Sequence, residues 1–173
     1  DDQAVLFCGT PCQVAGLKNY LTNDYEKLIT IDFACHGVPS PMLWNKYVEY
    51  IEEKRGNLNH ISFRSKHFGY HVTVMEETHE GNKTFYGSAR TNMMSKIFFS
   101  NIADRMSCYS SPFKTINRIS DLTVYDCWHA SKLVDGLSDN DKGYTNIIVQ
   151  SRKGQMLLDE CKSLFDLMET DTR

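Results

Sequence analysis

The 173-residue chain carries 19 Lys and Arg residues against 22 Asp and Glu residues, a formal net charge of −3, and 41% of its residues are hydrophobic. This composition supports a packed core, and the charge gives no reason to expect nucleic acid or an acidic membrane as a partner. No apolar run is long enough to span a bilayer. The chain begins without Met and has no signal peptide, so we expect a cytoplasmic protein, with residues 1–173 as a single domain cut from a longer chain.

The first part of the chain alternates strand and helix signals. Two apolar runs each end in a turn that is followed by amphipathic spacing. Thr10 and Ser40 are favourable N-cap residues, and each precedes a proline at the first helical position. We predict strand, helix, strand and helix over residues 4–8, 12–21, 28–34 and 41–55. This order indicates the parallel βαβα half of an α/β fold.

The second part mixes shorter signals. Alternation predicts strands at 61–64 and 70–78, and a turn at 80–82 lets residues 84–86 return as a hairpin partner. A helix at 92–106 would turn Ile102 inward. We further predict a loop at 107–120, strands at 122–125 and 146–150, and a closing helix at 154–168. Leu164 and Met168 would lie on the apolar stripe of this helix. We therefore expect an α/β fold, with a mixed sheet, helices on its faces and an added β-hairpin.

The segment around Cys12 carries the strongest chemical signal. Thr10 can be the N-cap of a helix, Pro11 fits its first position, and Gln13 completes a capping box. Cys12 would then lie among unpaired backbone N–H groups at the positive end of the helix dipole, where a thiolate is favoured. Such a cysteine is placed to bind a metal or to carry out redox chemistry.

The other cysteines differ in what their surroundings predict. Cys35 also follows a strand, so it would share the C-terminal edge of a parallel sheet with Cys12, and a loop could bring Cys108 there. We expect Cys8 and Cys161 to be small buried apolar residues, with Cys127 intermediate. No C-x-x-C pair and no bacterial ferredoxin pattern is present, so spacing alone does not establish a cluster.

One histidine has a neighbourhood that suggests more than a surface or core role. His36 lies between Cys35 and Gly37, and it could act as general base to a Cys12 nucleophile. That alternative enzyme class requires rapid, selective alkylation of Cys12. A serine hydrolase is not favoured, because the chain lacks a Gly-x-Ser-x-Gly elbow.

Five segments carry motif-like patterns, in chain order Gly9-Thr10-Pro11-Cys12-Gln13, 32–41 with Cys35-His36-Gly37, Phe63-Arg64-Ser65-Lys66 before Gly69-Tyr70, Arg105-Met106-Ser107-Cys108-Tyr109, and 118–128 with Asp126 and Trp128. Together they resemble the coenzyme F420 hydrogenase/dehydrogenase beta subunit family, specifically its C-terminal domain. The resemblance spans most of the chain, and its first motif with Cys-His-Gly is the most specific part.

This resemblance implies a flavin- and iron–sulfur-dependent oxidoreductase domain that transfers electrons. The implied cofactors are a 4Fe–4S cluster and FAD or another flavin, and the implied partners are a redox carrier and a ferredoxin module or other redox subunit. A ferredoxin-like module often precedes this domain in bacterial members. The resemblance assigns no catalytic residue.

The resemblance also assigns binding roles to individual residues. Cluster ligation falls to Cys12, Cys35 and Cys108, with Cys127 or Cys8 as a source of the fourth thiolate. Contacts to the cofactors fall to Gly9, Thr10, Gln13, His36, Gly37, Lys142 and Gly143.

Ser111 departs from the pattern that the family leads us to expect. The third motif usually has a second cysteine there, and a neutral serine hydroxyl is a poor substitute for a thiolate. The segment Asp126-Cys127-Trp128-His129 is a second departure, since the family has Phe and Gly where Cys127 and His129 stand. Three explanations stay open: another cysteine supplies the ligand, the cluster is incomplete, or it has been lost. In the last case the chain would be a non-catalytic α/β module, for example in a surface-polysaccharide pathway.

Overall fold

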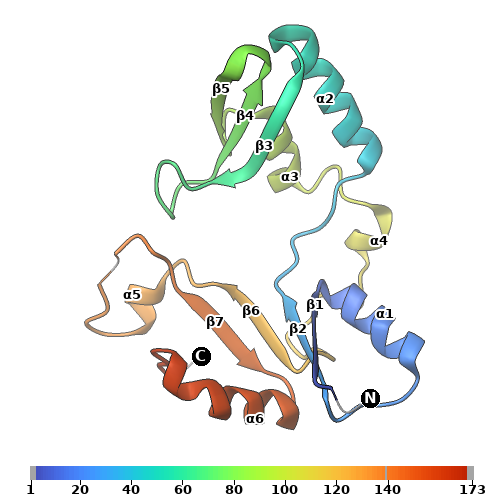
Figure 1. The fold of residues 1–173 in the computed structure, drawn as a ribbon, viewed down its shortest axis with the longest axis vertical. Coiled ribbons are helices and arrows are strands. Elements are labelled where there is room, and N and C mark those ends of the chain that lie inside the picture. Colours follow the sequence, from blue (N-terminus) through green and yellow to red (C-terminus); the bar gives the residue numbers. More distant parts are fainter. Residues whose placement is uncertain (1–2, 139, 171–173) are drawn as a thin grey trace. The chain divides into compact units, whose positions relative to one another are not determined.

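The computed structural model describes residues 3–138 and 140–170, and it divides them into two compact units. The parallel-sheet unit runs to Cys35 and resumes at Ser111, and the insert unit comprises His36–Ser110. In Figure 1 the strands of the parallel-sheet unit take their colours from the blue and the orange ends of the bar. A single domain over residues 1–173 stays a prediction, because compact units can still unfold together.

The sheet of the parallel-sheet unit confirms the predicted mixed α/β architecture. Its strands follow the order β1 (Val5–Gly9), β2 (Leu28–Phe33), β6 (Leu122–Asp126) and β7 (Thr145–Val149). The first three are parallel, and β7 pairs antiparallel to β6. The helix α1 (Pro11–Leu21) connects β1 to β2 and buries Val14 and Ala15.

Asp121 joins three elements of this unit. Its buried carboxylate accepts hydrogen bonds from the backbone N–H and the hydroxyl of Thr30 on β2, both at 2.8 Å. It also accepts one at 2.5 Å from Ser151, the N-cap of α6 (Arg152–Cys161). Burial acts to raise the pKa of Asp121, but the bonds from Ser151 and Thr30 outweigh it and hold this pKa below its ordinary value.

The chain after α6 differs from the sequence prediction. The closing helix ends at Cys161 and continues only as a short 3-10 turn, η2 (Lys162–Leu164), before Phe165 becomes extended. Leu164 and Met168, which a longer helix would have turned toward a core, are 74% and 48% exposed. Because most helical stability comes from burying an apolar face, this stripe alone does not prolong the helix.

The insert unit packs helices against a second sheet. The antiparallel order is β3 (Leu58–Ser65), β4 (Val74–His79) and β5 (Lys83–Ser88), with the 3-10 turn η1 (Glu80–Asn82) between the last two. The predicted hairpin is therefore confirmed, and β3 extends it to three strands. Helix α2 (Pro41–Arg55) begins at its predicted N-cap, Ser40. The core of this unit consists of Tyr47, Ile51, Met75 and Met94.

The predicted helix at 92–106 is divided in two. Helix α3 (Met93–Ser100) ends because Asn101 adopts the left-handed conformation, with φ 59°, and α4 (Met106–Tyr109) begins after a break. Ile102, expected to face inward, is 75% exposed. In the break Asp104 pairs with Pro39, and the Arg105 N–H donates to the carbonyl of Val38 at 2.9 Å. These contacts bring the two ends of the insert unit together.

A polar network lies inside the insert unit. Glu77, only 2% exposed, accepts hydrogen bonds from the Tyr47 hydroxyl, from Arg55, and from Asn92 at 2.9 Å. The Asn92 amide also donates to the Tyr47 oxygen at 2.7 Å. His79 is fully buried, and its Nε2 lies 3.7 Å from the Glu77 carboxylate. Burial and the bond to Glu77 raise the pKa of Tyr47.

Among the residues that the structure describes, no helix is both long and apolar enough to cross a membrane.

Candidate functional site

Three cysteines follow the C-terminal ends of three adjacent parallel strands. Cys12 is the second residue of α1 after β1, Cys35 lies two residues beyond β2, and Cys127 comes directly after β6. The strands are in register at this edge, since Gly9 pairs with Asp32. The shared edge that the sequence predicts for Cys12 and Cys35 is therefore observed, and Cys127 joins it. Ligands of open α/β sheets bind at this edge.

The start of α1 shows the predicted cap. The side chain of Gln13 accepts a hydrogen bond from the Thr10 backbone N–H at 2.8 Å. The exposed Cys12 Sγ lies 3.1 Å from the Thr10 hydroxyl, with which it shares a hydrogen bond. A Cβ on Gly9 would come within 3.1 Å of the Gln13 side chain. Gly9, Thr10 and Gln13 thus together form the turn that presents Cys12 in the first turn of α1.

Lys142 and Gly143 also precede an element that starts at this edge. Because Asp126, the last residue of β6, pairs with Thr145, the antiparallel strand β7 begins where β6 ends. Gly143 has a φ of 80°, which glycine adopts without strain. The Cys127 N–H donates to the carbonyl of Tyr144 at 2.8 Å. The segment before β7 is therefore tied to the segment that carries Cys127.

The remaining predicted residues belong to the insert unit. Cys108 is half-buried in α4. His36 Nε2 lies 2.9 Å from the carbonyl of Phe98, to which it donates as N–H, and its ring packs against the Phe98 ring at 4.6 Å between centroids. The carboxylate of Asp104 lies directly against Gly37, within 2.2 Å of where a Cβ would stand. Local packing thus accounts for glycine at position 37, and the cofactor roles of these three residues stay predictions.

The cysteines expected to be buried differ from that expectation. Cys8 is exposed, because it lies on the edge strand β1 on the same face as Leu6, which is itself 61% exposed. Cys161 is half-buried at the end of α6, and Cys127 is buried. Ser111 is half-buried, and its hydroxyl accepts a hydrogen bond from the Phe113 N–H at 3.4 Å. The side chain at the expected fourth cysteine position therefore supports a local turn.

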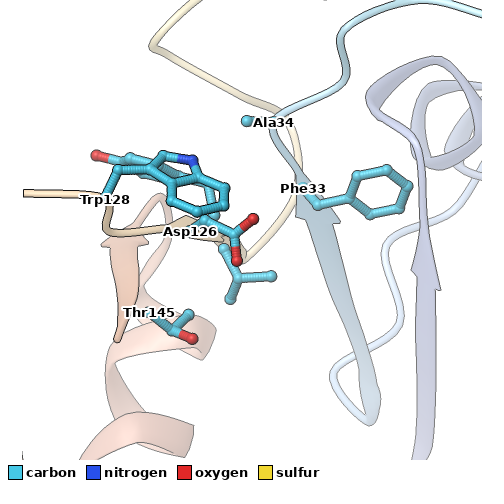
Figure 2. Close-up of a pocket in the computed structure, with 7 residues that line it drawn as sticks. Phe33, Ala34, Asp126, Trp128 and Thr145 are labelled. Carbon is cyan, nitrogen blue, oxygen red and sulfur yellow. The ribbon is translucent and has the colours of Figure 1, made fainter. Parts of the chain in front are cut away.

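A cavity of about 480 Å³ opens at the ends of β2 and β6, lined by the sequence neighbours of Cys35 and Cys127, and this volume is ordinary for a cofactor site. Figure 2 shows the Trp128 indole beside the Asp126 carboxylate, with Thr145 of β7 below them and Ala34 at the end of β2. The lining of this cavity consists mainly of Phe33, Ala34, Val124, Asp126, Trp128 and Thr145. We refer to it as the Trp128 cavity. The sequence alone predicts no role for the residues of this cavity, although Asp126 and Trp128 fall in a motif. The pairing of β6 with β7 brings Asp126 and Thr145 together, and it is the signal that could have revealed the cavity.

The chemistry of this edge suits the implied cofactors. Thiolates are the ligands of iron–sulfur clusters, and the aromatic face of Trp128, 42% exposed, suits a planar ring. Within residues 3–138 and 140–170, however, no three His, Cys, Asp or Glu side chains lie close enough together to hold a metal ion. The three cysteines share an edge and do not yet form a coordination sphere.

Comparison with known proteins agrees with the sequence motifs. Residues 2–171 match the family described as the C terminus of the beta subunit of coenzyme F420 hydrogenase/dehydrogenase. Among solved structures, a chain of the F420-reducing [NiFe] hydrogenase complex from Methanosarcina barkeri aligns with 11% sequence identity and a TM-score of 0.47. The alignment covers 92% of this chain and 48% of that one, so this chain spans about half its length. No curated protein matches the sequence. Because the family match extends over nearly the whole sequence, the chain belongs to the family of C-terminal domains of the coenzyme F420 hydrogenase/dehydrogenase beta subunit.

Proposed function

We propose that the chain is an electron-transfer domain of an oxidoreductase, with a flavin in the Trp128 cavity and an iron–sulfur cluster at the adjoining cysteines. The observation that supports this most strongly is that Cys12, Cys35 and Cys127 each follow the C-terminal end of one of three parallel strands, and that an aromatic cavity lies at the ends of two of these strands, β2 and β6. A flavin exchanges electrons in pairs and a cluster exchanges them singly, so together they connect a two-electron carrier to a one-electron acceptor.

The residues of the edge have separate parts in this proposal. Cys12 presents an exposed thiol at the start of α1, and the buried Cys127 holds its ligand position through the backbone bond to Tyr144. Cys108 stays a predicted ligand from the insert unit. Trp128 covers one face of the flavin ring, while Asp126 and Thr145 supply the few polar groups that orient a ligand in an apolar cavity.

Anaerobic purification followed by an iron assay and a visible spectrum tests the proposal. We expect iron, sulfide and flavin absorbance in the wild-type protein, and loss of iron in the Cys12→Ala and Cys127→Ala variants. Cys161→Ala is the matched control, because Cys161 is the last residue of α6 and neither follows one of the parallel strands nor lines the Trp128 cavity. Neither iron nor flavin after anaerobic reconstitution, or iron that is retained equally in all three variants, would contradict the proposal.

The Ser111→Cys variant separates an intact site from a degenerate one. If an alternative cysteine completes the cluster, the wild-type protein and the variant contain equal iron. Iron in the variant alone would show that the natural chain has lost its cluster and would favour a non-catalytic module.

A further inference from the structure

A second cavity lies at the same strand ends, on the opposite face of the sheet. It encloses about 280 Å³, and its lining includes Lys114, Arg118 and Thr123. Side chains alternate between faces along a strand, so Thr123 projects from the face opposite to Val124, which lines the Trp128 cavity. We refer to the second one as the Arg118 cavity. Arg118 and Thr123 fall in the motif segment 118–128, but the motif assigns them no role and the proposed function does not use this cavity.

Arg118 lines this cavity, and two nitrogens of its guanidinium have neighbours within the protein. Its Nε donates to the carbonyl of Thr115, and Nη1 lies 3.7 Å from the carboxylate of Asp32. Thr115 itself lines the cavity, so the Nε bond lies at the cavity wall, whereas Nη1 faces the buried carboxylate. The two contacts hold the guanidinium in the lining, where its remaining N–H groups are available to a ligand.

Asp32 is a positioning residue for Arg118. It is fully buried, and its two carboxylate oxygens accept no hydrogen bond within the described part of the chain. A buried carboxylate without a partner is costly, so the nearby guanidinium offsets its charge and is held in place by it. Because Asp32 has no exposed surface, an incoming ligand meets Arg118 and Lys114 and does not meet this carboxylate.

We propose that the Arg118 cavity binds the phosphate group of a ligand. Arginine offers planar paired donors that match phosphate oxygens, and Lys114 adds a second positive charge to the lining. The volume is too small for a whole nucleotide and is sufficient for a phosphate.

The ligand that best fits both cavities is a single flavin nucleotide, and this part rests on the proposed function. Ala34 and Tyr125 line both the Trp128 cavity and the Arg118 cavity. The ring would occupy the Trp128 cavity, and the chain behind it would pass over the carboxyl ends of β2 and β6, so that the phosphate reaches Arg118. The same cavity could also take the phosphate of a separate molecule, and the experiment distinguishes these sources.

The test compares FMN with riboflavin, which lacks the phosphate, by fluorescence titration. In the wild-type protein we expect FMN to bind at least about tenfold more tightly than riboflavin, because one charge-assisted hydrogen bond contributes about that factor in affinity. Arg118→Gln should abolish this ratio and leave riboflavin binding unchanged. Because loss of Arg118 leaves Asp32 buried without its partner, the double variant Asp32→Asn/Arg118→Gln repeats the test without that charge. Arg152→Gln, an exposed arginine that follows β7 at the opposite edge of the sheet, is the matched control.

Each result either supports or overturns the site. Equal affinities for FMN and riboflavin in the wild-type protein, or an FMN preference that survives in the double variant, would overturn it. If neither flavin binds, the proposed function fails. The phosphate site is then tested separately, by measuring whether inorganic pyrophosphate raises the thermal unfolding temperature. If pyrophosphate stabilises the wild-type protein and the Arg152→Gln variant but not the double variant, the cavity is a phosphate site for a separate ligand. If pyrophosphate gives no stabilisation that depends on Arg118, the proposed phosphate site is overturned.

Discussion

Both units of this chain contain a buried polar network, and the parallel-sheet unit also presents side chains at the ends of its strands. In the insert unit, Glu77, Tyr47 and Asn92 meet inside the fold and bond one another. In the parallel-sheet unit, Cys12 and Trp128 lie exposed at the strand ends. A buried and satisfied network fixes a structure, whereas groups left at a sheet edge can meet a ligand. In the proposed function, cofactor chemistry belongs to the parallel-sheet unit, and the interior of the insert unit has a mainly structural role.

The chain contains its own reporters for testing this contrast. It has two tryptophans, and Trp44 lies in the insert unit while Trp128 lies in the parallel-sheet unit. Trp128→Phe therefore leaves a fluorescence signal from the insert unit, and Trp44→Phe leaves one from the parallel-sheet unit. Each substitution below is measured in both backgrounds by urea denaturation.

The largest effect is expected for Glu77→Ala. Removing the buried Glu77 carboxylate leaves the buried Tyr47 hydroxyl and Asn92 amide without their acceptor, at about 1–3 kcal/mol for each unsatisfied group. Since we expect residues 1–173 to behave as one domain, both tryptophans should report the same lowered midpoint. Glu49→Ala is the control, because the exposed Lys46–Glu49 pair should contribute less than about 1 kcal/mol. A midpoint that falls only at Trp44 would show that the units unfold separately.

Gly154→Ala should destabilise the parallel-sheet unit by about 1–3 kcal/mol or more. The new Cβ would lie 2.1 Å from the backbone oxygen of Asp121, which cannot move without disturbing β6. Gly16→Ala in α1 is the matched control, since a Cβ there meets nothing within 4 Å and alanine favours the helix by about 1 kcal/mol. Equal changes in the two variants would refute this close contact.

Asp121→Asn should cost about 1.5–3 kcal/mol near neutral pH, because an amide cannot accept the bonds of Thr30 and Ser151 together. The pKa of Asp121 is lowered by folding, so its contribution is present above the ordinary carboxyl pKa and is lost as pH falls through the lowered value. The wild-type and variant proteins should therefore approach each other in stability in acid. A difference that stays constant from neutral pH into acid would exclude this linkage.

The smallest effect is expected for Asn101→Gly. Asn101 ends α3 in the left-handed conformation, which glycine adopts without strain, so the variant should gain up to about 1 kcal/mol. Asn101→Ala should lose stability at the same position. If glycine destabilised the insert unit, the break after α3 would have another cause.

The sequence predicts best those features that local chemistry determines. Thr10 and Ser40, each followed by proline, mark two helix starts that the structure confirms. The strands that precede Cys12 and Cys35 are short apolar runs, and a parallel arrangement follows from the intervening helix. The edge at which these cysteines meet is therefore readable from pattern alone.

Features that depend on distant partners are not readable in this way. The end of α3 carries no glycine or proline; the left-handed Asn101 closes the helix, and the distant contacts of Asp104 and Arg105 with 38–39 hold the chain in the break that follows. The Trp128 cavity needs the pairing of β6 with β7. No change of composition marks the boundaries at Cys35 and Ser111, because both units draw on the same residue types.

The position of the insert unit within the sequence has a consequence for how the chain folds during synthesis. The backbone N–H of Thr30 on β2 can form its native hydrogen bond only after Asp121, 91 residues later in the chain, has been synthesised. The insert unit has its two ends joined near Pro39 and Asp104, so it can close while β2 still lacks β6. Pairing across such a separation is slow to form. Nascent chains should therefore expose β1 and β2 for longest, which makes these strands the expected point of chaperone contact and of misassembly.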